Sequence, residues 1–186
     1  MREAARYRVR SERVRTLAHT LRGSLFPGDE RVLCAHVRRE AETLGCVPGR
    51  RYVVCPTPQG TVPTSTLLDN IVDRAATNGA SRIYLAHAGG AGFEDEPAKL
   101  LASLEERGFD ARTASTDTSV GFESLDPFDV SLVEQELCSI VDGFAPSARS
   151  TWSQTVVLDR SARGRRNAKP LDVGPAPVKT RRLPSH

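Results

Sequence analysis

Three glycines, Gly89, Gly90 and Gly92, follow the apolar run at residues 83–86 and precede a helix that we expect to begin near Pro97. A glycine-rich turn between a strand and a helix is a common phosphate site, because bare backbone N–H groups and the helix N-terminus both point towards the anion. The same position in an α/β fold can also hold an active-site loop. The chemistry of this turn therefore depends on the side chains around it.

The residues around the turn are acidic. Three carboxylates stand at residues 94–96, and no Lys or Arg lies between Arg82 and Lys99 to offset them. Two like charges ~4 Å apart repel by roughly 4 kcal/mol at an intermediate dielectric constant, so the turn disfavours a phosphate. It also matches neither the phosphate-loop motif nor the dinucleotide-binding motif. We predict that the protein binds no nucleotide and uses no cofactor.

The four cysteines, Cys34, Cys46, Cys55 and Cys138, form no C-x-x-C pair. Three of them could be imagined around zinc together with His36, but the spacing matches no familiar zinc site. We therefore predict buried thiols and no metal. The chain has no apolar run of membrane-spanning length and no signal-like segment at its start, which predicts a soluble, cytoplasmic protein without a membrane partner.

Hydrophobic periodicity predicts alternating helices and short strands. The expected helices carry an apolar stripe at helical spacing and lie at residues 29–44, 64–80, 96–108 and 128–144. The expected strands are short apolar or β-branched runs at residues 51–55, 82–86 and 110–114, with an edge strand at 155–159. Residues 1–22 fit a strand and a helix equally well. The alternation predicts an α/β fold, a three-layer sandwich with a mostly parallel sheet of about four to five short strands and helices on both faces.

Formal charge divides the chain into three blocks. Residues 1–51 carry a net charge of +6, residues 52–148 of −10 and residues 149–186 of +7. Charge blocks of this size inform on partners and solubility rather than on fold. Together with the end of the periodic pattern, they predict a basic N-terminal segment at 1–28, an α/β domain at 29–148 and a basic flexible C-terminal arm at 149–186.

The order of the segments from about Val32 to Phe144 resembles the catalytic domain of the small serine recombinases, the resolvase and invertase family. The stretches that carry the resemblance are VRREAETLG with RYVV, STLLDNIVDRAATNGASRIYLA, KLLASLEERGFDARTASTDTS and SLVEQELCSIVDGF. The resemblance implies a resolvase-like fold, and it implies a protein that self-associates into a homo-oligomer.

The residues that perform recombination in this family are altered here. Its Asp-Arg-Leu-x-x-Arg loop corresponds to AHAGGAGF, in which Gly89 and Gly90 stand where the Asp and the first Arg would be. Its nucleophile motif, Tyr-x-Arg-Val-Ser, is nearest to YRVRS, which ends at Ser11. Without fixed cations to stabilise the charge on the phosphate, attack of a serine hydroxyl on a phosphodiester is slow, because losing one such donor costs about 10²–10³ in rate. The resemblance therefore implies a vacated active-site loop with His87 and Gly92, in a pseudoenzyme whose one candidate nucleophile is Ser11.

The last block of charge suggests a nucleic-acid contact. RGRR at residues 163–166 resembles the short Arg-Gly-Arg segments that lie in narrow A·T-rich minor grooves, where the negative potential attracts arginine. The predicted contact residues are the basic side chains of this arm: Arg160, Arg163, Arg165, Arg166, Lys169, Lys179, Arg181 and Arg182.

Three functions are consistent with these patterns. The leading one is a non-catalytic, recombinase-like protein whose basic arm contacts duplex DNA, in an accessory or regulatory role in DNA transactions. The second is a divergent serine recombinase that uses Ser11, with Arg10 or Arg13 in place of the missing arginines. The third is a protein-binding or ribonucleoprotein-binding module in a larger assembly, with RNA instead of DNA as its nucleic acid.

Overall fold

The computed structural model of the chain describes residues 10–38, 52–55, 63–88, 95–114, 121–147, 150–171 and 178–181. Its helices are α2 (Glu12–Leu25), α3 (Thr64–Asn78), α4 (Glu96–Glu106), α5 (Pro127–Ile140) and α6 (Thr151–Ala162), with a short 3-10 helix, η2, at Phe122–Ser124. Its strands are β1 (Val32–Arg38), β2 (Tyr52–Cys55), β3 (Arg82–Ala88), β4 (Asp110–Arg112), β5 (Gly143–Ala145) and β6 (Val178–Arg181).

Four strands form an all-parallel sheet in the order β4-β3-β1-β5. β1 pairs with β3 along its whole length, from Val32 opposite Arg82 to Arg38 opposite Ala88. The chain builds outward from β1 through β3 to β4, and then returns to place β5 on the other side of β1. The direction in which strands are added therefore reverses between β1 and β5. The predicted fold class, an α/β sandwich with a parallel sheet, is confirmed.

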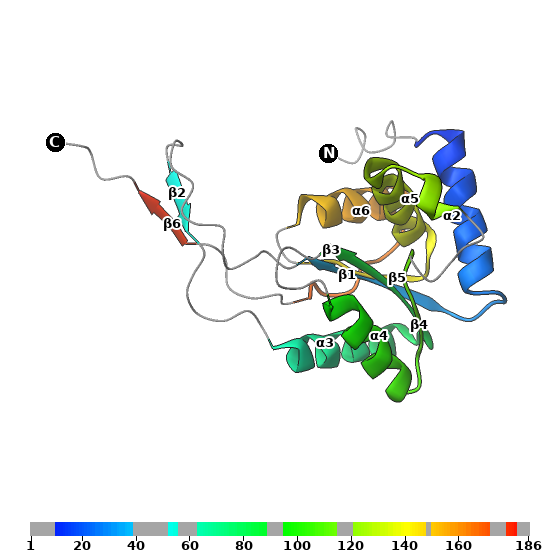
Figure 1. The fold of residues 1–186 in the computed structure, drawn as a ribbon, viewed down its shortest axis with the longest axis horizontal. Coiled ribbons are helices and arrows are strands. Elements are labelled where there is room, and N and C mark those ends of the chain that lie inside the picture. Colours follow the sequence, from blue (N-terminus) through cyan, green and yellow to red (C-terminus); the bar gives the residue numbers. More distant parts are fainter. Residues whose placement is uncertain are drawn as a thin grey trace.

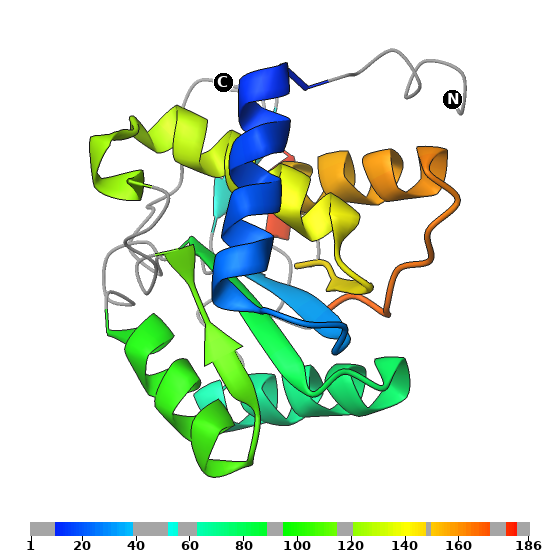
Figure 2. The same cartoon turned by 90° about the vertical axis from the view of Figure 1, so that its right-hand side faces the viewer.

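Helices cover both faces of this sheet. Figure 1 shows α2, α5 and α6 on one face and α3 and α4 on the other. Figure 2 shows α2 lying alongside α5, against which it packs. Alternate residues of β1 enter two different apolar clusters: Cys34 packs among residues of α2, α5 and α6, whereas Leu33 and Ala35 pack among residues of α3 and α4. Both faces of the strand are thus buried, as is typical of parallel sheets.

The helix predicted at residues 29–44 is wrong, because residues 32–38 form β1. Six of the seven residues of this strand are buried. A strand that is covered on both faces requires an uninterrupted apolar run, and such a run also satisfies the spacing of an amphipathic helix. Periodicity alone could not separate the two structures here.

Two predictions for the C-terminal half of the chain differ from the structure. The predicted edge strand at 155–159 lies inside α6, which packs against α5 and buries Val156. The helix predicted at 128–144 ends at Ile140, and β5 begins three residues later. β5 was missed because a three-residue strand is too short to show a periodic pattern. The strand at 155–159 was predicted from β-branched residues, whose strand propensity is overridden by the packing of α6.

Of residues 1–22, which fit a strand and a helix equally well, residues 12–22 belong to the helix α2, and residues 1–9 lie outside the described residues. The strand predicted at 51–55 is confirmed as β2, but it lies outside the parallel sheet. It pairs antiparallel with β6, with Tyr52 opposite Arg181, in a separate two-stranded ribbon.

Residues beyond the expected domain boundaries pack on the sheet. α2 and α6 both contact α5. After α6, the Ala168 N–H donates to the Phe144 carbonyl at 2.8 Å and the Leu171 N–H donates to the Pro146 carbonyl at 2.8 Å. The division of the chain at residues 28 and 148 into separate domains stays a prediction. Among the described residues, no helix has the length and apolar character needed to cross a membrane.

Two of the cysteines differ from the buried thiols expected. Cys34 on β1 and Cys138 on α5 form a disulfide with a Cα–Cα distance of 5.3 Å. The two residues are 104 positions apart in the sequence, so no local spacing could have indicated the pair.

Candidate functional site

The candidate site lies at the carboxyl ends of β1 and β5. These strands are neighbours, and the order of strand addition reverses between them. In open parallel sheets, ligands bind outside the carboxyl ends of the strands at such a reversal point. β1 ends at Arg38 and β5 at Ala145, and α6 begins shortly after β5. The helices that follow parallel strands place their N-termini at this edge, so the peptide dipoles of α6 favour an anion there.

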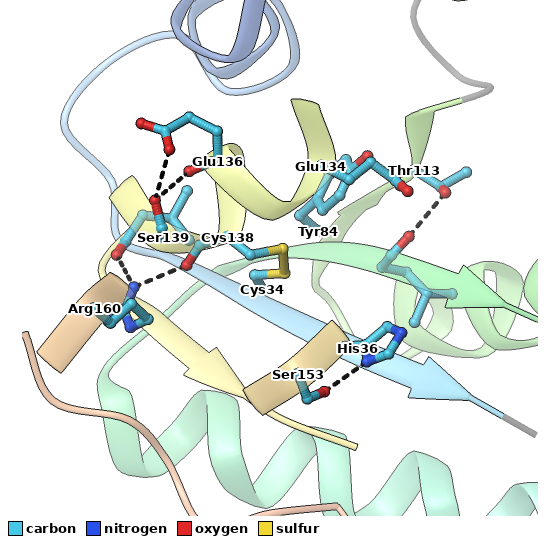
Figure 3. Close-up of a disulfide and its surroundings, with 12 residues drawn as sticks. Cys34, His36, Tyr84, Thr113, Glu134, Glu136, Cys138, Ser139, Ser153 and Arg160 are labelled. Atoms are coloured by element: carbon cyan, nitrogen blue, oxygen red, sulfur yellow. Dashed lines mark hydrogen bonds between the residues drawn. A yellow bond between two sulfur atoms is a disulfide. The ribbon is translucent and has the colours of Figure 1, made fainter. Parts of the chain in front are cut away.

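His36 is the central side chain at this edge. It lies on β1 and is only 3% exposed. Its imidazole stacks on the ring of Trp152 from α6, with the ring centroids 4.2 Å apart. Its Nδ1 lies 2.7 Å from the Oγ of Ser153, also on α6. Figure 3 shows His36 and Ser153 facing each other between β1 and α6. The ring is therefore fixed in position by contacts on its face and at one nitrogen.

The hydrogen bonds around Ser153 favour one tautomer of His36. The Ser153 Oγ accepts the backbone N–H of Ser147 at 2.9 Å, so its own proton is available for Nδ1 of His36. We assign the tautomer in which Nδ1 accepts this proton and the ring proton resides on Nε2. Burial lowers the pKa of His36 to about 3, and the charges of Arg38 and His87 add to the effect. At neutral pH, His36 is therefore a neutral imidazole, and in the assigned tautomer its Nε2–H is a donor held in place by the contacts of the ring.

Backbone contacts join the ends of the two strands beside His36. The backbone N–H of Arg38 donates to Ser147 Oγ at 3.3 Å. Ser150 caps α6, since its Oγ accepts the Ser153 N–H at 3.3 Å. Arg38 itself is exposed. The edge thus combines one exposed guanidinium, one fixed neutral donor and one capped helix N-terminus, all of which are suited to a ligand that carries phosphate.

A second polar cluster lies at the end of β3. The Nε2 of His87 is 3.3 Å from Glu96 Oε2, and Thr64 donates its hydroxyl to Glu96 Oε1 at 2.9 Å. The side chains of His87 and Glu96 are each 5% exposed. This cluster connects β3 to the N-termini of α3 and α4. Of the loop predicted to be a vacated active site, only His87 is described; Gly89, Gly90 and Gly92 lie outside the described residues.

Ser11, the predicted nucleophile, is the N-cap of α2. Its Oγ accepts the N–H of Val14 at 3.3 Å. The neighbouring Arg10 forms ion pairs with Glu136 at 3.2 Å and with Asp159 at 2.8 Å, which attach the start of α2 to α5 and α6. The structure therefore gives Ser11 a helix-capping contact and gives Arg10 carboxylate partners.

The residues predicted to contact DNA have different environments. Arg160 is fully buried. Arg163 donates to both carboxylate oxygens of Glu136, at 2.8 and 3.0 Å, and Arg165 donates to the Val141 carbonyl at 3.0 Å. Arg166 and Lys169 are exposed, Lys179 and Arg181 lie in β6, and Arg182 lies outside the described residues.

The Arg160 guanidinium binds backbone carbonyls where α5 turns into β5. Nη1 donates to Cys138 and Val141 at 3.0 and 2.7 Å, and Nη2 donates to Asp142 and Arg166 at 2.9 and 2.8 Å. Figure 3 shows Arg160 beside Cys138 at this turn. The last carbonyls of a helix have no partner within the helix, so Arg160 satisfies groups that would otherwise be buried without one.

Comparison with known proteins gives a structural likeness only. No protein-family model and no curated protein matches the sequence. Among solved structures, POFUT1 in complex with GDP matches with a TM-score of 0.57 and 17% identity, over 86% of this chain and 46% of that one. POFUT1 in complex with GDP-fucose matches with a TM-score of 0.53 and 17% identity, over 88% of this chain and 47% of that one. POFUT1 is a GDP-fucose protein O-fucosyltransferase. The chain spans about half the length of the structures it matches.

These neighbours correct several predictions. The resemblance to serine recombinases is wrong, because the fold matches POFUT1 instead. The recombinase-like functions, the DNA partner and the binding-module alternative have no support, and the expectation of no small-molecule ligand conflicts with neighbours that bind GDP and GDP-fucose. The resemblance rested on the order of helices and strands, which many α/β folds share.

Sequence reasoning missed the site at the end of β1. His36 was considered only as a zinc ligand, and the residues around it were placed in a helix. The available signal was a histidine and an arginine, His36 and Arg38, among the last three residues of the largely apolar segment that forms β1. Trp152, Ser147 and Ser153 gave no signal, because they reach His36 only through the packing of α6 on the sheet.

Proposed function

We propose that this chain is a nucleotide-sugar-binding domain of the glycosyltransferase type, which binds a nucleoside diphosphate sugar at the carboxyl ends of β1 and β5. The observation that carries the proposal is His36, a buried neutral donor fixed by Ser153 and Trp152 beside the exposed Arg38. The likeness of the fold to POFUT1 in complex with GDP and GDP-fucose makes GDP the first nucleotide to test.

The groups at this edge match the chemistry of a diphosphate. A guanidinium binds two phosphate oxygens at once through parallel N–H donors, so Arg38 supplies both charge and orientation. The N-terminus of α6 adds the positive end of a helix dipole, and the Nε2–H of His36 adds a neutral donor. When a sugar leaves a nucleoside diphosphate, negative charge grows on the phosphate oxygens, and fixed donors of this kind stabilise it. Binding is the activity proposed for this chain.

Substitution of Arg38 tests the proposal. We expect Arg38→Ala to weaken GDP binding by about 10-fold to 100-fold, since a hydrogen bond to a charged group contributes about 1.5–3 kcal/mol. Calorimetry measures the dissociation constant directly. Arg107→Ala is the matched control, because Arg107 follows α4 and its partner is Asp69 on the exposed surface. Equal affinity of the Arg38→Ala and Arg107→Ala proteins would contradict the proposed site.

The fluorescence of Trp152 gives a second test. Trp152 is the only tryptophan of the chain, and it stacks on His36. Because the pKa of His36 is lowered to about 3, the imidazole does not change charge between pH 5 and 8. The emission of the ligand-free protein should therefore show no component from His36 over that range. A transition with a midpoint near the ordinary histidine pKa of about 6.5 that is present in the native protein and absent from the His36→Asn protein would show that His36 is not held neutral, whereas a transition common to both belongs to another group such as Glu134. The His36→Asn protein, which has no imidazole to titrate here, is the control.

A further inference from the structure

The disulfide between Cys34 and Cys138 lies directly beside the candidate site. Cys34 is two residues before His36 on β1, and side chains two apart on a strand face the same side of the sheet. Cys34 and Cys138 are both fully buried. Figure 3 shows the disulfide between β1 and α5, on the same side of the sheet as His36 and Ser153. The bond therefore attaches the strand that carries His36 and Arg38 to α5.

Cys138, the second cysteine of the disulfide, is connected to the β5–α6 side of the site. The carbonyl of Cys138 accepts Nη1 of Arg160 at 3.0 Å, and the same nitrogen binds the Val141 carbonyl at 2.7 Å. β5 follows directly, pairs with β1 and leads to Ser147, which accepts the N–H of Arg38. Through the disulfide and the contacts of Arg160, β1 is thus connected to the segment from β5 to α6 in addition to the hydrogen bonds of the sheet. These two segments lie on either side of the point where the strand order reverses.

We propose that the Cys34–Cys138 disulfide is a redox-sensitive device that sets the ligand affinity of this edge. In the oxidised protein, β1 is cross-linked to α5, and the donors of His36, Arg38 and Ser147 stay in the geometry that binds the ligand. A dithiol reductant breaks the S–S bond: it gives two electrons and two protons to the two cysteines and becomes a cyclic disulfide. The reduced protein keeps two adjacent buried thiols, which pack as small apolar groups, but β1 and α5 move independently. That the edge binds a nucleotide rests on the function proposed above.

Burial of the two cysteines controls how fast the disulfide is reduced. Because both cysteines are fully buried, a reductant reaches the S–S bond only when α5 opens from the sheet. We expect reduction to be slow in buffer and to accelerate in denaturant concentrations that leave the protein folded. This separates the Cys34–Cys138 bond from any exposed disulfide, which a dithiol reduces without an opening step.

Amide hydrogen exchange tests the device without any ligand. The informative amides are those of Arg38, bonded to Ser147 Oγ, and of Ser147, bonded to Ser153 Oγ. We expect both to exchange at least about 10-fold faster in the dithiothreitol-reduced protein, because local opening sets their exchange rate. The amides of Ala80 and Phe109, which bond at the ends of α3 and α4, are the internal comparison and should change little. Unchanged exchange at Arg38 and Ser147 overturns the proposal.

GDP titration of the oxidised and reduced proteins tests the affinity. We expect the reduced protein and a Cys34→Ala/Cys138→Ala variant to bind GDP at least about 5-fold more weakly, with the variant insensitive to dithiothreitol. A Cys46→Ser/Cys55→Ser variant should keep the full redox response, which excludes the other two cysteines as its origin. Alkylation of thiols after denaturation, followed by mass spectrometry, establishes the redox state of each sample.

The outcomes of the two experiments are distinguishable. Equal GDP affinity in both redox states overturns the device even if the exchange rates differ. If neither state binds GDP, the proposed nucleotide site is overturned, and the exchange rates of Arg38 and Ser147 decide whether the disulfide orders this edge. A redox response that disappears in the Cys46→Ser/Cys55→Ser variant also overturns the assignment to Cys34 and Cys138.

Discussion

An Arg160→Met variant is expected to lose about 3–5 kcal/mol of unfolding free energy, or to fail to fold. The Arg160 side chain is fully buried and donates to four backbone carbonyls at the α5–β5 turn and after α6. Methionine fills part of the space but donates nothing, and each buried acceptor left without a partner costs about 1–3 kcal/mol.

Chemical denaturation measures the Arg160 effect, with two variants beside it. Arg160→Lys keeps the charge but has one nitrogen in place of the planar guanidinium, so we expect a loss intermediate between the native protein and Arg160→Met. Arg166→Met is the matched control, because this arginine is exposed, and its stability should change by less than about 0.5 kcal/mol. If Arg160→Met unfolds at the same denaturant concentration as Arg166→Met, the guanidinium is not the structural centre of this turn.

Acid is expected to destabilise the native protein relative to a His36→Asn variant, by about 2–3 kcal/mol between pH 7 and pH 4.5. The folded-state pKa of His36, about 3, lies below its ordinary value of 6.5. In the unfolded chain, His36 therefore binds a proton near pH 6.5, whereas in the folded chain it binds the proton only near pH 3. The stability held by the neutral imidazole is present above pH 6.5 and falls as the pH decreases towards 3. Asparagine does not titrate, so its protein lacks this component.

The pH dependence is expressed as a difference between the native and His36→Asn proteins because Glu134 also titrates in this range. Burial raises the pKa of Glu134 to about 7, although the hydroxyl of Tyr84 bonds to its carboxylate at 2.8 Å. Its effect on stability has the opposite sign, because the folded protein retains a proton that the unfolded chain loses near pH 4.5. Glu134 is the same in the native and His36→Asn proteins, so its contribution cancels in their difference. Unfolding free energies from pH 4.5 to 8 give that difference, and a value independent of pH would contradict the neutral, buried His36.

The sequence predicted the fold class but not the arrangement of the sheet. Gly79 ends α3 in a left-handed conformation with φ at 61°, within two residues of the predicted end of that helix. The Asp126 carboxylate accepts the N–H groups of Phe128 and Asp129 and caps α5, two residues before the predicted start of that helix. These signals are local, because a cap or a stop involves residues within a few positions of each other. The predictions of β3 and α4 rested on the same kind of signal.

The central strand and the candidate site depend on contacts between distant residues. β1 is apolar on both faces because helices cover both, and this pattern does not distinguish it from a helix. Ser153 reaches His36 across 117 positions, and Cys34 reaches Cys138 across 104. Neither pair leaves a spacing in the sequence. The recombinase resemblance failed for a related reason, since it compared an order of elements without the order of the strands in the sheet.

The proposed ligand site at the carboxyl ends of β1 and β5 is tested most directly by amide chemical shifts during a titration with GDP. We predict saturable shifts at Arg38 and Ser147 and at the indole N–H of Trp152, whose donor bond to Ser131 Oγ is 3.0 Å long. The amides of Ala80 and Phe109, at the ends of α3 and α4, should not move. An absence of saturable shifts, or shifts confined to the exposed basic residues Arg166 and Lys169, would contradict a nucleotide site at this edge.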